Sequence, residues 1–179
     1  LPNDSNDKPV YRGSQLATIS SLLFMNTSNY SFPNLQLPSF EAKIQTVLQR
    51  TEIFDVFRKR FVLLSPEEWV RQHMLHYMVG HLGYPPGLLG VEVSLRLHGL
   101  VKRADIVLYD RKADPWMLVE CKAAHVQLNQ NVFDQAARYN VQMRVPYLVI
   151  TNGNKLMAAE INQQTGTIRP LQQMPVFNP

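Results

Sequence analysis

The sequence lacks a long hydrophobic run, a pair of cysteines and a phosphate-binding loop. No stretch of its 179 residues approaches the roughly 18 consecutive apolar residues of a transmembrane helix, so we expect no membrane span. The apolar run Leu22 to Met25 is too short for a signal-peptide core, and no basic segment precedes it. A single cysteine, Cys121, cannot form an internal disulfide, which favours a reducing, cytoplasmic setting. No G-x-x-x-x-G-K-S/T pattern occurs, so ATP hydrolysis by a P-loop is not expected.

The histidines and the cysteine offer little for other chemistries. His73 and His76 would share a helical face with His81 nearby, but the H-E-x-x-H spacing of a zinc hydrolase is missing. Strand alternation turns Cys121 toward the apolar side, and no histidine is placed to activate it as a nucleophile. Zinc and thiol catalysis are therefore disfavoured.

The charge of the chain is mildly basic and locally clustered. The net charge is +4 and the isoelectric point is about 9.3, and apolar residues make up 45%, which is enough for one ordinary core. The cations gather at residues 58–60, 102–103 and 111–112. Such clusters are expected of a protein that binds a phosphate backbone, and they are equally typical of solvated surfaces.

The organisation of the chain suggests an extension followed by one domain. Residues 1–36 are rich in Asn, Ser and Pro and predict a weakly structured N-terminal extension, with a domain over residues 37–179. Ser65-Pro66-Glu67-Glu68 predicts the start of a helix that stops by Gly83, because Ser65 can cap and Pro66 suits the first helical position.

Period-two alternation then predicts strands, and a second helix interrupts them. We expect three strands at Val91–Leu97, Lys102–Tyr109 and Trp116–Ala123, with His98-Gly99 as the turn between the first two. A helix at Gln127–Val141, a strand at Pro146–Thr151 and a closing hairpin of residues 155–162 and 167–171 should follow. The first three strands should be antiparallel, and the strand after the helix should run parallel to the one before it. The sequence therefore predicts an α/β fold with a mixed β-sheet flanked by helices.

Three charged residues stand out in otherwise apolar strands. Asp105 lies inside Ala104–Leu108, and Glu120 and Lys122 end the next predicted strand, where alternation places both on one face. A carboxylate in such a strand is costly to bury unless it is paired, hydrogen-bonded or bound to a metal. Two acids beside one lysine could hold a hard divalent cation through oxygen atoms. The same three residues could also form a purely structural ion-pair cluster.

The following helix makes a resemblance specific. Gln135 and Tyr139 lie one turn apart and share a face. With Asp105 and Glu120-x-Lys122 before them, they resemble PD-(D/E)xK nucleases of the QxxxY subgroup, and in particular the type I restriction enzyme R protein N-terminal domain family. Further segments that look like this family are residues 53–60, 65–72, 102–107 and 145–153. Ala104 stands where the motif's name has proline, which is a departure from the pattern.

The resemblance implies a restriction-endonuclease-like core and a set of roles. Asp105, Glu120 and the backbone carbonyl of Cys121 would ligate Mg²⁺ or Mn²⁺, and Lys122 would orient the attacking water. A glutamate of the first helix would complete the site, with Glu67 as the first choice and Glu68 as the fallback. Nucleic-acid contacts and support of the site would come from Gln135, Tyr139, Arg138, Arg103, Lys102 and Arg71.

The function that the resemblance implies is metal-dependent hydrolysis of DNA phosphodiester bonds by a bacterial, restriction-enzyme-like protein without its own ATPase. DNA would be the partner, together with a motor or specificity subunit, and a homodimer is left open. A non-cleaving nucleic-acid-binding or complex-assembly domain that keeps the nuclease fold is the alternative.

Overall fold

The described chain forms a small antiparallel β-sheet, a large mixed β-sheet and two α-helices. The computed structural model describes residues 32–97 and 100–178, without the side chains of residues 95–97, 100–102, 139 and 141–143. Most of the predicted extension and the predicted His98-Gly99 turn lie outside the described residues. The compact unit that carries the structure begins at Ser31. Within it, Leu37 donates its backbone N–H to the carbonyl of Gly153 at 3.0 Å, so this segment packs on the large sheet.

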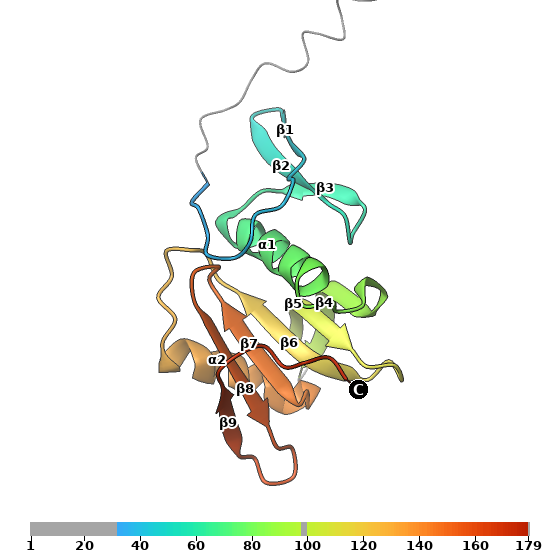
Figure 1. Ribbon diagram of the computed structural model, residues 1–179, viewed down its shortest axis with the longest axis vertical. Helices are drawn as coiled ribbons and strands as arrows, with labels where there is room; N and C mark the ends of the chain where they lie inside the picture. The colour runs from blue at the N-terminus through green and yellow to red at the C-terminus, as the bar shows by residue number, and fades with distance from the viewer. Residues whose placement is uncertain (1–31, 98–99, 179) are drawn as a thin grey trace, which may run out of the picture. The chain divides into compact units, whose positions relative to one another are not determined.

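A small sheet that the sequence did not predict precedes the first helix. Its three strands pair in order and antiparallel: β1 (Ile44–Val47), β2 (Arg50–Asp55) and β3 (Arg60–Leu63) (Figure 1). The β1–β2 turn uses Leu48 and Gln49 with positive φ values of 47° and 63°, and the turn into β3 uses Lys59 with φ 53°. Left-handed positions usually carry Gly or Asn, so these turns left no recognisable signal in the sequence.

Helix α1 (Pro66–Gly80) begins where the sequence predicted it. The Ser65 hydroxyl accepts the backbone N–H of Glu68 at 3.1 Å, and Pro66 occupies the first turn. The chain leaves the helix through Gly83 at φ 69°, a conformation that suits glycine, and then forms the short 3₁₀ helix η1 (Pro86–Leu88).

The large sheet confirms the predicted α/β class and its mixed topology. It has six strands in sequence order: β4 (Leu89–Leu97), β5 (Leu100–Tyr109), β6 (Pro115–Cys121), β7 (Tyr147–Thr151), β8 (Leu156–Ile161) and β9 (Ile168–Leu171). All neighbours are antiparallel except β6 and β7, which are parallel because helix α2 (Gln130–Met143) connects them.

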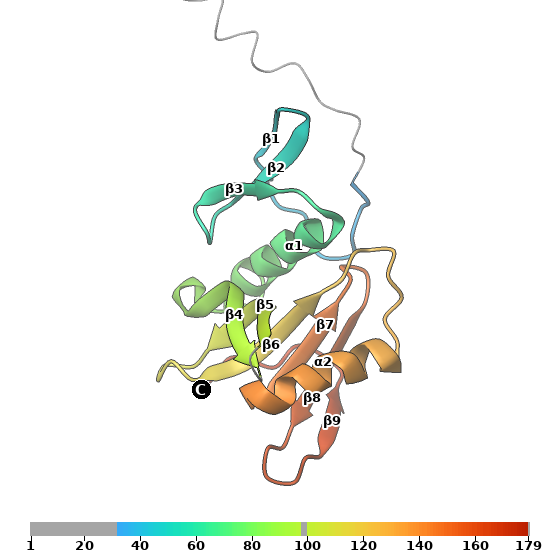
Figure 2. The ribbon, with the colours of Figure 1, turned by 180° about the vertical axis from the view of Figure 1, so that it is seen from behind.

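The two helices pack on different apolar layers of the large sheet (Figures 1 and 2). Helix α1 contributes Val70, Met74, Leu75 and Met78 to one cluster with Ile106, Met117 and Val119. Helix α2 contributes Phe133 and Ala136 to another with Val107, Leu118 and Leu148. Because these layers fix the sheet between the helices, the middle of β5 lies within reach of polar side chains from α1.

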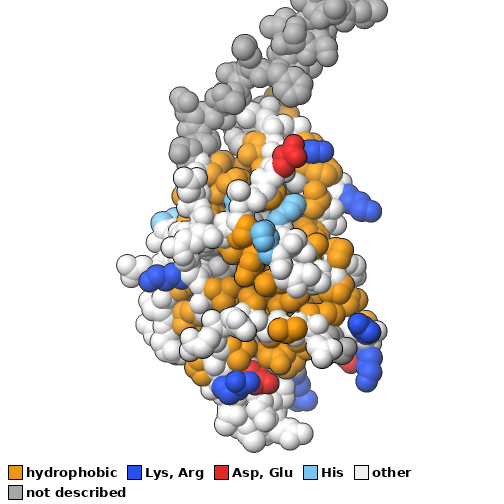
Figure 3. Space-filling view, in the orientation of Figure 1, with side chains coloured by type: hydrophobic (Ala, Val, Ile, Leu, Met, Phe, Trp, Pro, Cys, Tyr) orange, Lys and Arg blue, Asp and Glu red, His pale blue; other side chains and the backbone are white. Residues whose placement is uncertain are grey.

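One face of the molecule carries few charges. In Figure 3 the described Lys and Arg side chains are scattered, mainly toward the edges of that face, with apolar side chains between them. The cation clusters of the sequence therefore do not merge into a basic surface on this side. No helix in the part of the chain that the structure describes is long and apolar enough to cross a membrane.

Candidate active site

The acids of the predicted site lie opposite each other, Asp105 in the middle of β5 and Glu120 near the end of β6. The antiparallel register pairs Ile106 with Val119, so one residue further along the two strands Asp105 faces Glu120. The Asp105 Oδ2 atom accepts the backbone N–H of Cys121 at 2.7 Å. This hydrogen bond fixes one carboxylate oxygen of Asp105 against the end of β6.

Lys122 completes the predicted trio on the same side. Its Nζ atom donates to the Glu120 Oε1 atom at 2.8 Å. Burial raises the pKa of Glu120 and the nearby Asp105 carboxylate raises it further, while the bond from Lys122 lowers it. Burial alone would lower the pKa of Lys122, but its bond to Glu120 outweighs burial and the pKa is raised. The lysine is thus held as a cation beside two acids that repel each other.

Arg71 is the cation that the structure places closest to Asp105. Its Nη2 atom lies 2.6 Å from the Asp105 Oδ1 atom, and its Nη1 atom pairs with Glu68 and lies 3.5 Å from Glu92. Its side chain is only 9% exposed. Burial alone would lower the pKa of Arg71, but the charges of Asp105 and Glu68 outweigh burial and raise it. Arg71 therefore stays charged at the centre of three carboxylates.

A second buried arginine ties the small sheet to this cluster. Arg58 pairs with Asp55 and Glu68, and its Nη1 atom lies 2.7 Å from Glu92. Gln72 donates to Asp55 at 2.9 Å and to Glu68 at 2.8 Å. Burial alone would raise the pKa of Asp55, but the hydrogen bonds from Arg58 and Gln72 outweigh burial and lower it. The pairs run without a break from the β2–β3 turn to Asp105 in the middle of β5.

Sequence reasoning missed the members of this network that lie outside the motif: Asp55, Arg58, Gln72 and Glu92. The segment around Arg58 was noted for its charge and for its family likeness, which was the available signal. Glu92 left none, because it alternates like a surface residue of its strand, and its unusual backbone (φ 51°) is visible only in the structure.

The remaining predicted residues lie apart from the acid pair or on its rim. Glu67 is exposed in the first turn of α1, whereas its neighbour Glu68 is buried and bonded to Arg71. Gln135 and Arg138 are exposed on α2, and none of the hydrogen bonds found among the described side chains joins them to the acids. Arg103 is 62% exposed and lies 3.4 Å from Glu92. Lys102 lies in β5 and Tyr139 in α2, but their side chains are among those not described.

The donor set fits a hard divalent cation in part. Asp105 and Glu120 supply two carboxylates from adjacent strands, and their mutual repulsion is the electrostatic condition that a cation relieves. Within the described ranges, no three His, Cys, Asp or Glu side chains are arranged to hold a metal ion without help. Further ligands would therefore have to be backbone carbonyls or water, with the Cys121 carbonyl nearest in sequence to Glu120.

The chain belongs to the family described as type I restriction enzyme R protein N terminus, whose model matches residues 66–175. The match begins at α1 and ends beyond β9, so it includes Glu68, Arg71, Asp105, Glu120 and Lys122 and leaves out the small sheet. This is the family that the residue pattern resembled.

A solved structure gives a distant match. It is a fragment described as an HsdR subunit of a type I restriction enzyme from Vibrio vulnificus YJ016, with 23% identity and a TM-score of 0.37. The alignment covers 49% of this chain and 19% of that chain, so this chain corresponds to less than a fifth of it. No curated protein matches the sequence.

Proposed function

We propose that this protein is a metal-dependent nuclease that hydrolyses DNA phosphodiester bonds, as a restriction-enzyme-like module. One observation carries the proposal. In a chain of the type I restriction enzyme R N-terminal family, Asp105 faces Glu120 across adjacent strands with Lys122 bonded beside them. Hydrolysis of a phosphodiester requires groups that hold a divalent cation and a group that stabilises negative charge on the phosphate. Two acids can serve the first purpose and a lysine the second.

Asp105 and Glu120 would hold Mg²⁺ or Mn²⁺, with the Cys121 carbonyl as a third ligand. When bound, the cation would supply Lewis-acid stabilisation of the phosphate oxygens and lower the pKa of a coordinated water. Lys122 is partly exposed, so its ammonium group can reach a phosphate and stabilise the negative charge that develops there. Its bond to Glu120 keeps the ammonium group oriented until the substrate arrives.

Glu68, rather than Glu67, is the helical acid in this proposal. Glu68 is buried and pairs with both Arg71 and Arg58, whereas Glu67 is exposed. Glu68 would act as a positioning residue, since it holds Arg71 and Arg71 holds Asp105. Gln135, Tyr139, Arg138 and Lys102 stay predicted contacts for DNA, and a motor or specificity subunit stays the predicted partner.

The test is cleavage of plasmid and linear duplex DNA with Mg²⁺ or Mn²⁺. Variants D105N, E120Q and K122M should lose activity by at least about 100-fold, the scale on which one charge-stabilising group acts in such sites. E67Q serves as the matched control, because Glu67 is an exposed acid of the same helix, and it should keep activity within about twofold of the wild type. Circular dichroism and thermal melting establish that each variant is folded.

A second function is favoured by one observation, namely that Arg71, a side chain of the protein itself, pairs with Asp105 and neutralises its charge. It is a non-cleaving domain that binds nucleic acid. Salt-sensitive DNA binding with no cleavage in either metal would support this function and contradict the nuclease. Equal cleavage by wild type and D105N would contradict the assignment of the site.

A further inference from the structure

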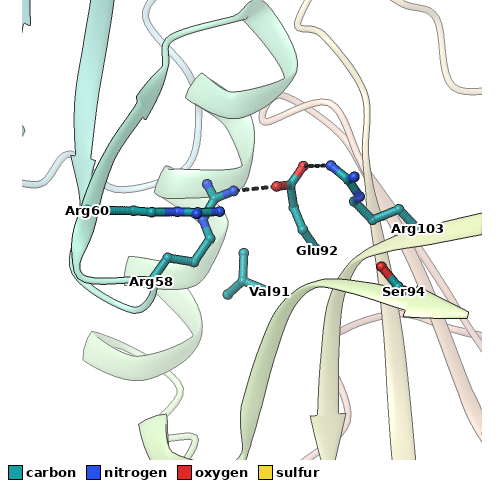
Figure 4. A pocket seen from close by; sticks show the side chains of 6 residues that line it. All are labelled: Arg58, Arg60, Val91, Glu92, Ser94 and Arg103. Atoms are coloured by element: carbon teal, nitrogen blue, oxygen red, sulfur yellow. Dashed lines mark hydrogen bonds and ion pairs between the residues drawn. The ribbon is translucent and has the colours of Figure 1, made fainter.

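A pocket beside the acid pair is lined by more cations than acids. It measures about 390 Å³, and its lining residues come from the β2–β3 turn and β3 on one side and from β4 and β5 on the other: Arg58, Arg60, Val91, Glu92, Ser94 and Arg103 (Figure 4). None of these six belongs to the Asp105, Glu120 and Lys122 trio. The pocket nevertheless adjoins it, because Glu92 contacts Arg71 at 3.5 Å and Arg71 contacts Asp105 at 2.6 Å.

Two of the three arginines have few or no carboxylate partners in the described part of the chain. Arg58 is buried and engaged by Asp55, Glu68 and Glu92. Arg60 is exposed and forms no ion pair with any carboxylate in the described part of the chain. Arg103 is exposed as well, with the single 3.4 Å contact to Glu92. A guanidinium group matches the geometry of a phosphate through paired N–H donors, so the pocket offers an anion two adaptable cations.

The acid in the pocket serves to place the arginines. Glu92 has a left-handed backbone with φ 51°, a conformation that is strained for a non-glycine residue. Figure 4 shows its carboxylate lying between Arg58 on one side and Arg103 on the other, with an interaction to each. The ion pairs offset the backbone strain, and strained residues of this kind gather at functional sites. The hydroxyl of Ser94, exposed on β4, adds a donor to the same wall.

We propose that this pocket binds a backbone phosphate of nucleic acid that neighbours the phosphate to be cleaved. Arg60 and Arg103 bind the phosphate, Ser94 donates a hydrogen bond to it, and Glu92 orients Arg103. The inference that a neighbouring phosphate is cleaved rests on the function proposed above. The inference that the pocket binds a phosphate is argued from its lining residues alone. The exposure of both arginines suits a strand that runs across the surface.

The test is the binding of a short labelled duplex in EDTA, measured by fluorescence anisotropy over a range of salt concentrations. R60Q and R103Q should each weaken binding about three- to tenfold and reduce the slope of log affinity against log salt by about 0.9, which is the effect of losing one phosphate contact. R111Q is the matched control, since Arg111 is exposed in the turn that follows the far end of β5, and its affinity should stay within about twofold.

Each outcome bears on the proposal. R60Q and R103Q that bind DNA like R111Q would overturn it. Titration with inorganic phosphate separates the sources of the anion: if phosphate binding depends on Arg60 and Arg103 but DNA binding does not, the pocket is a free-anion site and the proposal fails. If neither the wild type nor any variant cleaves DNA while R60Q and R103Q still lose affinity, the proposed nuclease function is contradicted and the proposed phosphate pocket is supported. If cleavage depends on Asp105 while R60Q and R103Q bind DNA like the wild type, the phosphate pocket is contradicted and the proposed nuclease function is not.

Discussion

Replacing Arg71 with methionine should destabilise the protein more than any change to an exposed charge. Arg71 is 9% exposed and lies among Glu68, Glu92 and Asp105, whose side chains are 7%, 25% and 15% exposed. Methionine fills much of the same volume but carries no charge, so these carboxylates lose a shared cation. Removing one member of a buried ion pair typically costs about 3–5 kcal/mol because the other member stays buried and uncompensated.

The network itself sets where in that range the loss should fall. Arg58 still pairs with Glu68 and Glu92 in the variant, so those two acids keep a cation. Asp105 keeps the backbone N–H of Cys121 but loses its ion pair. We therefore expect the lower end, about 3 kcal/mol, which corresponds to a fall of about 6–12 °C in Tm for a domain of this size.

Urea unfolding followed by circular dichroism measures the loss. The midpoint should fall while the slope stays constant, since the surface exposed on unfolding does not change. R103M is the matched control: its side chain is 62% exposed with one 3.4 Å contact, so it should cost less than about 1 kcal/mol. A loss for R71M no larger than that of R103M would refute the reasoning, because it would mean that the cluster contributes no more than surface ion pairs do.

Two further predictions concern single positions. In metal-free buffer, E120Q should melt at a higher temperature than wild type near pH 7. Burial and Asp105 raise the pKa of Glu120, so ionised Glu120 lowers the stability of the folded state at pH values above the unfolded pKa of about 4.3. The difference should vanish below about pH 3, where Glu120 is protonated in both states, and a pH-independent difference would contradict this cause. N140A should lower the free energy of unfolding in urea by about 2–4 kcal/mol, because the buried Asn140 amide accepts the N–H of Val145 at 3.1 Å and donates to its carbonyl at 3.0 Å. Q163A is the control and should cost less, because it removes only one part-buried hydrogen bond to that carbonyl.

The large sheet was predictable because its local signals agree with its tertiary structure. Alternating strands, the Ser65 cap and the helix between two buried strands each point to one arrangement. The turn at Asp110–Asp114 was also predictable, and its Asp110 side chain accepts two backbone N–H groups of that turn. The facing of Asp105 and Glu120 depends as well on a shift of register between Leu108 and Tyr109, because the pairing of Tyr109 with Pro115 would otherwise bring Asp105 opposite Val119. The strands that carry the two acids are therefore contained in local sequence, and the register that makes the acids face each other is not.

The ion-pair network was not predictable, because burial of a charge depends on what packs over it. Glu68 and Arg71 are three residues apart, a spacing that on a sequence looks like an ordinary surface pair of a helix. The small sheet covers them, and that sheet gave no signal because its turns use Leu48, Gln49 and Lys59 instead of glycine. The difference in burial between Glu67 and Glu68 corresponds to a rotation of about 100° on a helix, and it depends on packing.

The same residues support a metal site and a structural ion-pair cluster, and Arg71 is where the two interpretations differ. A cation between Asp105 and Glu120 would compete with the guanidinium for the Asp105 Oδ1 atom. Such competition is costly if the displaced arginine is left buried without a partner. Arg71 is not in that position, because Glu68 already holds its Nη1 atom and Glu92 lies 3.5 Å from the same atom. Release of Asp105 to a cation would therefore leave Arg71 paired, so the proposed metal site is compatible with the ion-pair cluster.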